Sequence, residues 1–401
     1  MAMTINTNIS SINAQRNLSL SGGSLATSMQ RISSGLRVNS AKDDAAGLAI
    51  SERMNSQVRG LTVASRNAND GISLAQTAEG ALGKMGDMLG RMRDLAVQAG
   101  NSTNSQSDRD ALQSEVKQLT DEIDRVAKTA NFNGQKILDG SFAGAVFQVG
   151  ANSGENITVG GLTNASAKGL ANVKYATTKV ADAAATLTPA GLAEVKTGLT
   201  ITIEGGAAID LGPLKAASSN DERMGQVVAA INNKTADTGV TAFLTKETDG
   251  TFSLNVMSDG VKADGTAKTV TLGAGFTATA TGLTGTIAVA AAGGSAAKGI
   301  DTLTVATQKD AWIALKKIDS AIDQVNSSRA DLGALQSRFE NTTANIDIQT
   351  ENLSAARGRI VDADFAKETA NLSRTQILQQ AGTAMVAQAN QLPQQVLSLL
   401  R

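Results

Sequence analysis

The sequence predicts a mainly α-helical protein in which an α+β or β-rich domain is inserted between two helical halves. Apolar residues recur at steps of three, four and seven over long stretches at both ends, as in helices that pack in coiled coils or bundles. Aromatic residues make up only 2% of the chain, so Ala, Leu, Ile, Val and Met must form the core. The middle of the chain shifts to Thr, Ala and Gly with β-branched alternation, which predicts a separate domain.

These observations divide the chain into five parts. An N-terminal inner coiled-coil helix is predicted over residues 1–41, followed by bundle helices and a β-hairpin over 42–175. A surface-exposed α+β domain is expected over 176–306. The chain then returns through a bundle helix over 307–356 and ends in an inner coiled-coil helix over 357–401. This nested order places both ends of the chain together.

Residues 4–36 carry a narrow apolar stripe on a predicted helix that is about 50 Å long, at about 1.5 Å of rise per residue. The period slips between Ile12 and Leu18. One helix cannot bury such a stripe alone, so we expect it to contact partner helices and to be disordered in a lone subunit. The predicted assembly residues of this helix are Ile5, Ile9, Ile12, Leu25, Met29, Ile32 and Leu36.

A second amphipathic stretch occupies residues 360–400. Apolar stripes at both termini predict a protein that associates through its ends, driven by burial of apolar surface. The predicted assembly residues of this stretch are Ile377, Ala381, Ala384, Leu392, Val396 and Leu399.

Local signals mark the remaining elements. A hydroxyl residue followed three positions later by an acid predicts capping boxes at Ser40 with Asp43, Ser107 with Asp110, and Thr307 with Asp310. The long helices predicted between the termini span about 58–99, 107–130 and 307–356, and a polar joint is expected at 357–364. Short apolar runs predict strands at 137–138, 146–149, 157–159, 199–203 and 252–256, and a helix is expected at 221–232.

Composition excludes several classes of function. The net charge is −1 with scattered basic residues, so no nucleic-acid surface is expected. The chain has no cysteine and no histidine, which removes disulfides, zinc sites and thiol or imidazole catalysis. Acidic residues of the insert show no ligand-like clustering, so we expect no enzyme and no cofactor. No secretory signal and no membrane-spanning run of about eighteen apolar residues is visible, so membrane insertion is not expected.

Several motifs together resemble one family, the bacterial flagellins. They include INTN at 5–8, RISSGLR at 31–37 and AKDDAAGLAI at 41–50 in the N-terminal half. The C-terminal half adds LQQAG at 378–382 and LSLLR at 397–401. The central region carries no such match, as expected of the variable outer domain of that family.

The resemblance implies a structural subunit that polymerises through its terminal helices into the flagellar filament used for motility. The terminal helices would pair as a coiled coil that lines the inner tube. The implied partners are further copies of the chain, an export chaperone at the C-terminal helix, the filament cap and the hook-associated junction proteins. The implied location is extracellular, after secretion through the flagellar type III apparatus. A hook–filament junction protein, which has similar end helices, is the alternative.

The resemblance also implies a host Toll-like receptor as a partner in innate immune recognition. The family's contact positions fall on Arg91, Leu95, Gln98 and Glu115 of this sequence. The sequence departs from the commoner family pattern at Gly90, Met92 and Asp94. The alternative is that these residues form contacts between subunits, and we rank this structural role above receptor binding.

Overall fold

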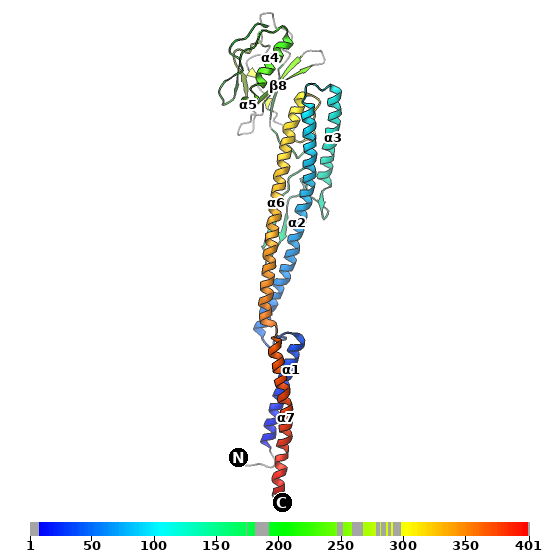
Figure 1. Cartoon of the computed structure of the whole chain (residues 1–401), viewed down its shortest axis with the longest axis vertical. Coiled ribbons are helices and arrows are strands. Elements are labelled where there is room, and N and C mark those ends of the chain that lie inside the picture. Colours follow the sequence, from blue (N-terminus) through cyan, green and yellow to red (C-terminus); the bar gives the residue numbers. More distant parts are fainter. Residues whose placement is uncertain are drawn as a thin grey trace. The chain divides into compact units, whose positions relative to one another are not determined.

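The computed structural model describes residues 8–173, 175–180, 192–246, 252–258, 268–277, 281, 286–287, 290–291 and 298–399. The chain divides into two compact units. One contains residues 1–70, 147–157 and 339–401, and the other contains residues 71–146 and 158–338. Helices dominate and small sheets occupy the middle of the chain, so the predicted fold class is confirmed (Figure 1). The finer five-part division stays a prediction.

The two terminal helices, α1 (Ile9–Ser34) and α7 (Phe365–Leu399), lie side by side and run antiparallel (Figure 1). The Asn8 side chain caps α1 by accepting a hydrogen bond from the Ser11 amide, and Gly35 ends the helix with a left-handed φ of 71°. In this structure each terminal helix is a partner for the other; the expected disorder of these helices in a lone subunit stays a prediction.

A short backbone joint ties the near ends of these two helices. The amide of Arg37 donates to the carbonyl of Val361 over 2.6 Å, and the amide of Ala363 donates to the carbonyl of Gly35 over 2.9 Å. Helix α6 (Gln308–Val361) therefore runs further than the predicted end near residue 356, and only residues 362–364 separate it from α7. The predicted polar joint at 357–364 is shorter than expected.

The long helix α2 (Ala45–Ala99) begins earlier than the sequence predicts. Its cap is Asp44, whose carboxylate accepts a hydrogen bond from the Gly47 amide at 2.8 Å. The predicted box at Ser40 and Asp43 closes a separate turn just before the helix. The box at Thr307 and Asp310 is confirmed at the start of α6.

Helix α3 (Gln106–Thr129) has its cap at Ser105, two residues before the predicted cap Ser107. Ser105 and Asp108 form the capping box, and the carboxylate of Asp110 accepts a hydrogen bond from Gln106 instead. The assignment to Ser107 and Asp110 was wrong because both pairs fit the same sequence pattern.

Two hairpins follow α3: β1 (Asn131–Phe132) with β2 (Gln135–Lys136), and β3 (Ala145–Gln148) with β4 (Asn156–Val159). The predicted strands at 146–149 and 157–159 are therefore confirmed. The predicted strand at 137–138 is wrong, since Ile137 and Leu138 are buried in a bend.

The insert contains two four-stranded sheets, in the orders β11-β10-β6-β7 and β12-β5-β9-β8. Its helices are α4 (Asn220–Asn232) and the short α5 (Thr235–Thr238). The strands are β5 (Ala176–Val180), β6 (Thr200–Ile203), β7 (Ile209–Asp210), β8 (Val240–Lys246), β9 (Phe252–Ser258), β10 (Val270–Leu272), β11 (Thr286–Ile287) and β12 (Ala290–Ala291). The predicted strands and helix of the insert are found to within two residues.

One apolar core joins both sheets of the insert to α4. Leu254 and Val256 of the inner strand β9 are fully buried in it, together with Ile231 of α4. Strand β8 lies at a sheet edge, but its outer backbone is occupied: the Asn232 amide both donates to and accepts from the backbone of Ala242, at 2.9 and 2.8 Å. The insert thus closes part of its own exposed strand edge.

The segments that enter and leave the insert are tied to each other. Asn172 and Lys298 form an antiparallel bridge, and the amide of Ile300 donates to the carbonyl of Ala167 at 2.7 Å. Lys317 of α6 is 3% exposed and donates to the carbonyl of Gly299 at 3.1 Å. Burial lowers the pKa of Lys317 below its usual value, as expected of an ammonium group removed from water.

Candidate assembly surface on the paired end helices

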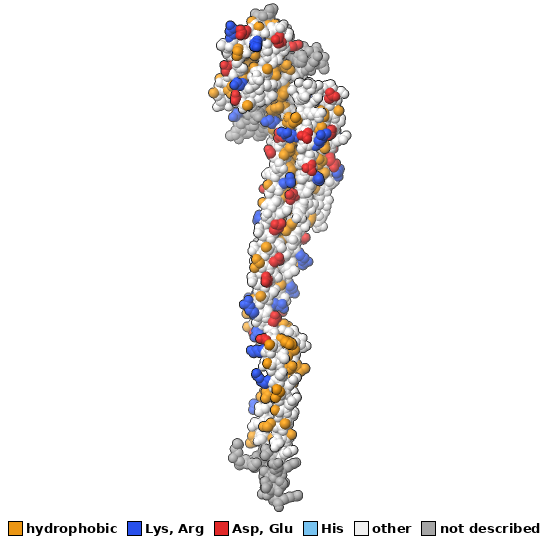
Figure 2. Space-filling model, in the orientation of Figure 1, with side chains coloured by type: hydrophobic (Ala, Val, Ile, Leu, Met, Phe, Trp, Pro, Cys, Tyr) orange, Lys and Arg blue, Asp and Glu red, His pale blue; other side chains and the backbone are white. Residues whose placement is uncertain are grey.

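Large apolar side chains remain on the surface of the α1–α7 pair, where Figure 2 shows hydrophobic groups gathered. On α1, Ile9 is 63% exposed and Leu20 is 64% exposed. On α7, Ile377 is 65% exposed and Met385 is 63% exposed. Contiguous exposed apolar surface on a soluble chain marks an interaction site, so this pair is the candidate functional surface.

Helix α7 carries two distinct faces. The inner face, directed at α1, consists of positions seven residues apart: Glu368, Thr375, Gly382 and Ala389. Three of these are buried, and a Cβ atom on Gly382 would lie 3.2 Å from Leu18 of α1. The outer face consists of the exposed residues Ile377, Leu378, Ala381, Ala384 and Met385. At 100° per residue the two faces lie about 120° apart, so one neighbour cannot cover both.

Helix α1 also divides its apolar residues between two faces. Leu18, Leu25 and Ile32 are half-buried and share the heptad position of Ser11, which contacts α7. Ile9 and Ile12 are exposed on another face. The slip predicted between Ile12 and Leu18 therefore marks a change of face along the helix.

The remaining predicted assembly residues fall into three groups. Met29 is exposed, and Leu36 is half-buried at the joint. Ala381 and Ala384 belong to the outer face of α7. Outside the described residues lie Ile5 and the side chains of Leu392, Val396 and Leu399.

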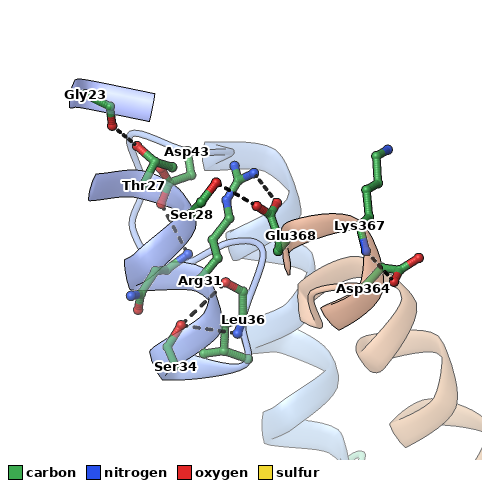
Figure 3. A network of polar contacts seen from close by, with 11 residues as sticks. Gly23, Thr27, Ser28, Arg31, Ser34, Leu36, Asp43, Asp364, Lys367 and Glu368 are labelled. Carbon is green, nitrogen blue, oxygen red and sulfur yellow. Dashed lines mark hydrogen bonds and ion pairs between the residues drawn. The ribbon is translucent and has the colours of Figure 1, made fainter. Parts of the chain in front are cut away.

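The inner contact is more polar than the sequence analysis expected. Ser28 and Arg31 of α1 point at Glu368 of α7, and each donates a hydrogen bond of 3.0 Å to its carboxylate (Figure 3). Burial alone would raise the pKa of Glu368. Hydrogen bonds from Arg31 and Ser28, the charge of Arg31 and a hydrogen bond from Asn371 outweigh burial and hold that pKa below its ordinary value.

Polar contacts also join the far ends of the two helices. The Asn8 amide donates to the carbonyl of Ala389, and the Ser11 hydroxyl donates to the Asn390 side chain, each at 2.7 Å. The sequence analysis did not identify these contacts at the far ends, nor the contact of Ser28 and Arg31 with Glu368. One signal was available: Ser11 lies seven residues before Leu18 and fourteen before Leu25, at the same heptad position.

The four residues that the family resemblance assigns to receptor contact do not form one surface. Arg91 and Glu115 form an ion pair of 2.7 Å between α2 and α3, and Gln98 is exposed. Leu95 is 1% exposed, so its side chain belongs to the core. Apart from the neighbouring residues and backbone of its own helix, no described atom lies within 4 Å of where a Cβ of Gly90 would be, so the surface beside Arg91 has room for a side chain.

Chemical sites are not prominent. Among the residues that the structure describes, no group of three or more acidic side chains is placed to hold a metal ion. Within the same residues, no helix combines the length and apolar character that crossing a bilayer requires.

Comparison with known proteins identifies the family. The model of the bacterial flagellin N-terminal helical region matches residues 5–143, and that of the C-terminal helical region matches residues 315–400. The chain is 41% identical to flagellin C of Vibrio cholerae and 39% identical to B-type flagellin of Pseudomonas aeruginosa. It is also 39% identical to flagellin of Salmonella typhimurium, and each match covers 100% of both chains. The chain belongs to the bacterial flagellin family.

Flagellins are the structural subunits of the extracellular flagellar filament. The predictions of a filament subunit and of a protein that is no enzyme are therefore confirmed. The relatives that match over the full chain are named flagellins, which decides against the hook–filament junction protein. A flagellin polymerises with copies of itself.

Proposed function

We propose that the subunits join through the exposed apolar residues of α1 and α7. The outer face of α7 and the exposed residues Ile9, Ile12 and Met29 of α1 are the assembly surface, and exposure in the single chain is the observation that carries this proposal. By sequence spacing, Ile5 lies seven residues before Ile12, and Leu392 and Leu399 lie seven and fourteen residues after Met385, so they continue the exposed faces. Val396 lies seven residues after Ala389 and continues the inner series instead. Leu25, Ile32 and Leu36 act indirectly, by holding α1 on α7.

The energetics favour polymerisation over a closed dimer. Burying a large apolar side chain contributes about 1.5–3 kcal/mol, so a few of them offset the ordering of the helices. The exposed faces of α1 and α7 differ in sequence, so a contact between the α1 of one subunit and the α7 of the next is heterologous. Such contacts generate open helical polymers when the rotation from one subunit to the next does not close a ring.

A charge on the outer face of α7 tests the proposal. The double variant Ile377→Asp, Met385→Asp places carboxylates in that face without touching α1. We expect the variant to stay monomeric when seeded with filament fragments, as measured by sedimentation and negative-stain microscopy. The matched control, Gln376→Asp, Thr383→Asp, adds the same two charges at exposed positions outside the face and should polymerise. Normal filaments from the double variant would refute the proposal.

We also propose the finer partners that the family implies. An export chaperone covers the outer face of α7 before secretion, which prevents early association of an exposed apolar surface. The subunit is then secreted through the flagellar export channel and meets the filament cap and the junction proteins outside the cell. Binding of a cognate chaperone to full-length chain, and its loss in the Ile377→Asp, Met385→Asp variant, tests the first step.

For the host receptor we retain Arg91, Gln98 and Glu115 and leave out Leu95, whose side chain is buried. Arg91→Ala should reduce receptor signalling by the monomer. The control is Arg93→Ala, which removes another exposed arginine that is ion-paired, at 2.7 Å, with Asp319. Equal signalling by both variants would remove Arg91 from the contact set.

A further inference from the structure

We infer that Glu368, with Ser28 and Arg31, sets the register in which α1 packs against α7. Glu368 is 7% exposed and Ser28 is 6% exposed, so the carboxylate and the hydroxyl meet inside the contact (Figure 3). A polar residue buried at one position of a coiled coil is a known means of fixing register. Glu368 is thus a specificity-determining residue for the pairing of the two ends.

The apolar part of the contact does not fix the register by itself. Leu18, Leu25 and Ile32 recur every seven residues on α1, so a slip of one heptad places one apolar side chain where another was. The facing residues of α7, such as Thr375 and Gly382, are small and can pack against any of these apolar side chains. Repeating apolar positions of this kind leave register weakly specified.

Slipped registers leave the carboxylate of Glu368 without a cation. A slip of one heptad in one direction places Ser21 and Ser24 opposite Glu368, and neither carries a charge. A slip in the other direction places Gly35 and Val38 there, beyond the end of α1. A carboxylate buried without its ionic partner is strongly disfavoured, so the native register is selected.

The backbone joint offers a rival explanation. The bonds from Arg37 to Val361 and from Ala363 to Gly35 also hold the two helices at one end. If the joint alone fixed the register, replacing Glu368 would leave the alignment of the helices unchanged. The two explanations therefore predict different results for the same variant.

Engineered cysteine pairs report the register, because the chain has no cysteine of its own. A Cβ on Gly382 would lie 3.7 Å from the Cβ of Leu18, within the range that a disulfide needs. Leu18→Cys with Gly382→Cys therefore reports the native register. Ser11→Cys and Leu25→Cys, each combined with Gly382→Cys, report slips of one heptad in either direction.

The three reporters are placed in the full chain with Glu368, with Glu368→Leu and with the off-contact control Lys367→Leu. Each protein is oxidised as monomer and as polymer, and linked peptides are quantified by mass spectrometry. We expect the native link to dominate with Glu368 and in the control. With Glu368→Leu we expect it to fall several-fold while a slipped link rises, and the charge-swapped pair Arg31→Glu, Glu368→Arg should restore it.

Two outcomes overturn the inference. A native link as strong in Glu368→Leu as with Glu368 means that the joint sets the register. Loss of all three links in Glu368→Leu means that Glu368 is needed for pairing as such. The inference rests on the proposed function only in that the α1–α7 pair is the part that enters the filament. Cross-linking of the monomer does not require polymerisation. A wrong register inference is therefore distinguishable from a wrong assembly proposal.

Discussion

The paired end helices and the insert of this flagellin bury their apolar residues in opposite ways. In the insert, Leu254, Val256 and Ile231 are fully buried in a core shared by both sheets and α4. In the end pair the buried inner positions include Ser28 and Glu368, while large apolar side chains remain exposed on the outer faces. The insert is complete within one chain, and the end pair is not.

This difference separates folding from assembly. A domain that closes its own core and covers part of its strand edge has little to gain from a neighbour. A helix pair with a polar, narrow contact and apolar outer faces leaves apolar surface that, under the proposal above, the next subunit buries. One chain can therefore form a stable exposed domain and remain unfinished at the end that polymerises.

The largest expected effect comes from removing part of the end pair. Deletion of residues 381–401 removes most of the outer face of α7 and the contacts of Asn8 and Ser11. We expect polymerisation to be abolished, while the insert keeps its own thermal transition because none of its core lies in the deleted segment. Sedimentation after seeding and calorimetry of the monomer measure the two halves of this prediction. Normal filaments from the shortened chain would contradict the comparison.

The same substitution placed in each region should have opposite effects. Leu254→Ala in the insert should destabilise that domain by about 2–5 kcal/mol, because it leaves a cavity in a closed core. Filaments should still form. Leu378→Ala, at a residue that is 49% exposed, should leave monomer stability nearly unchanged and weaken polymerisation. Denaturant unfolding of the monomer and the critical concentration for polymerisation separate the two, and matching profiles would break the comparison.

A smaller effect is expected at the closed strand edge of the insert. Asn232→Ala removes both hydrogen bonds to the backbone of Ala242 and should cost roughly 1–2 kcal/mol of insert stability. It also frees part of the edge of β8, so the monomer should self-associate more at high concentration. Asn233→Ala is the control, since within the described part of the chain no hydrogen bond joins its side chain to β8. Equal stability and equal self-association of the two variants would show that α4 protects the edge of β8 by covering it, and not through the hydrogen bonds of Asn232.

Sequence patterns predicted the helices and most strands, since period and capping chemistry act over a few residues. They failed where two neighbouring residues fitted the same capping pattern, as Ser105 and Ser107 do. They also failed at Ile137 and Leu138, which are buried but do not form a strand. Sequence spacing predicts the assembly residues only as a set, because their division into inner and outer faces depends on where α7 lies. Glu368 was missed because a single acid acquires its role only from partners more than 300 residues away.

The smallest effect concerns pH and distinguishes the polar inner contact from the apolar outer faces. The pKa of Glu368 is lower in the pair than its ordinary value of 4.5. Such a carboxyl stabilises the pair above its unpaired pKa, and this contribution is lost as pH falls through the lower paired value. We therefore expect the α1–α7 pair to weaken as pH falls from about 4.5.

The variant Glu368→Gln supplies the control for this effect, because glutamine keeps a similar shape but does not titrate. Between neutral pH and acid, the stability of the pair should fall more in the parent chain than in the variant. The yield of the native Leu18→Cys, Gly382→Cys link, measured in both backgrounds at each pH, reports this difference without contributions from acids elsewhere in the chain. Parallel pH profiles would mean that Glu368 is not charged in the pair, and the inner contact would then act through shape alone.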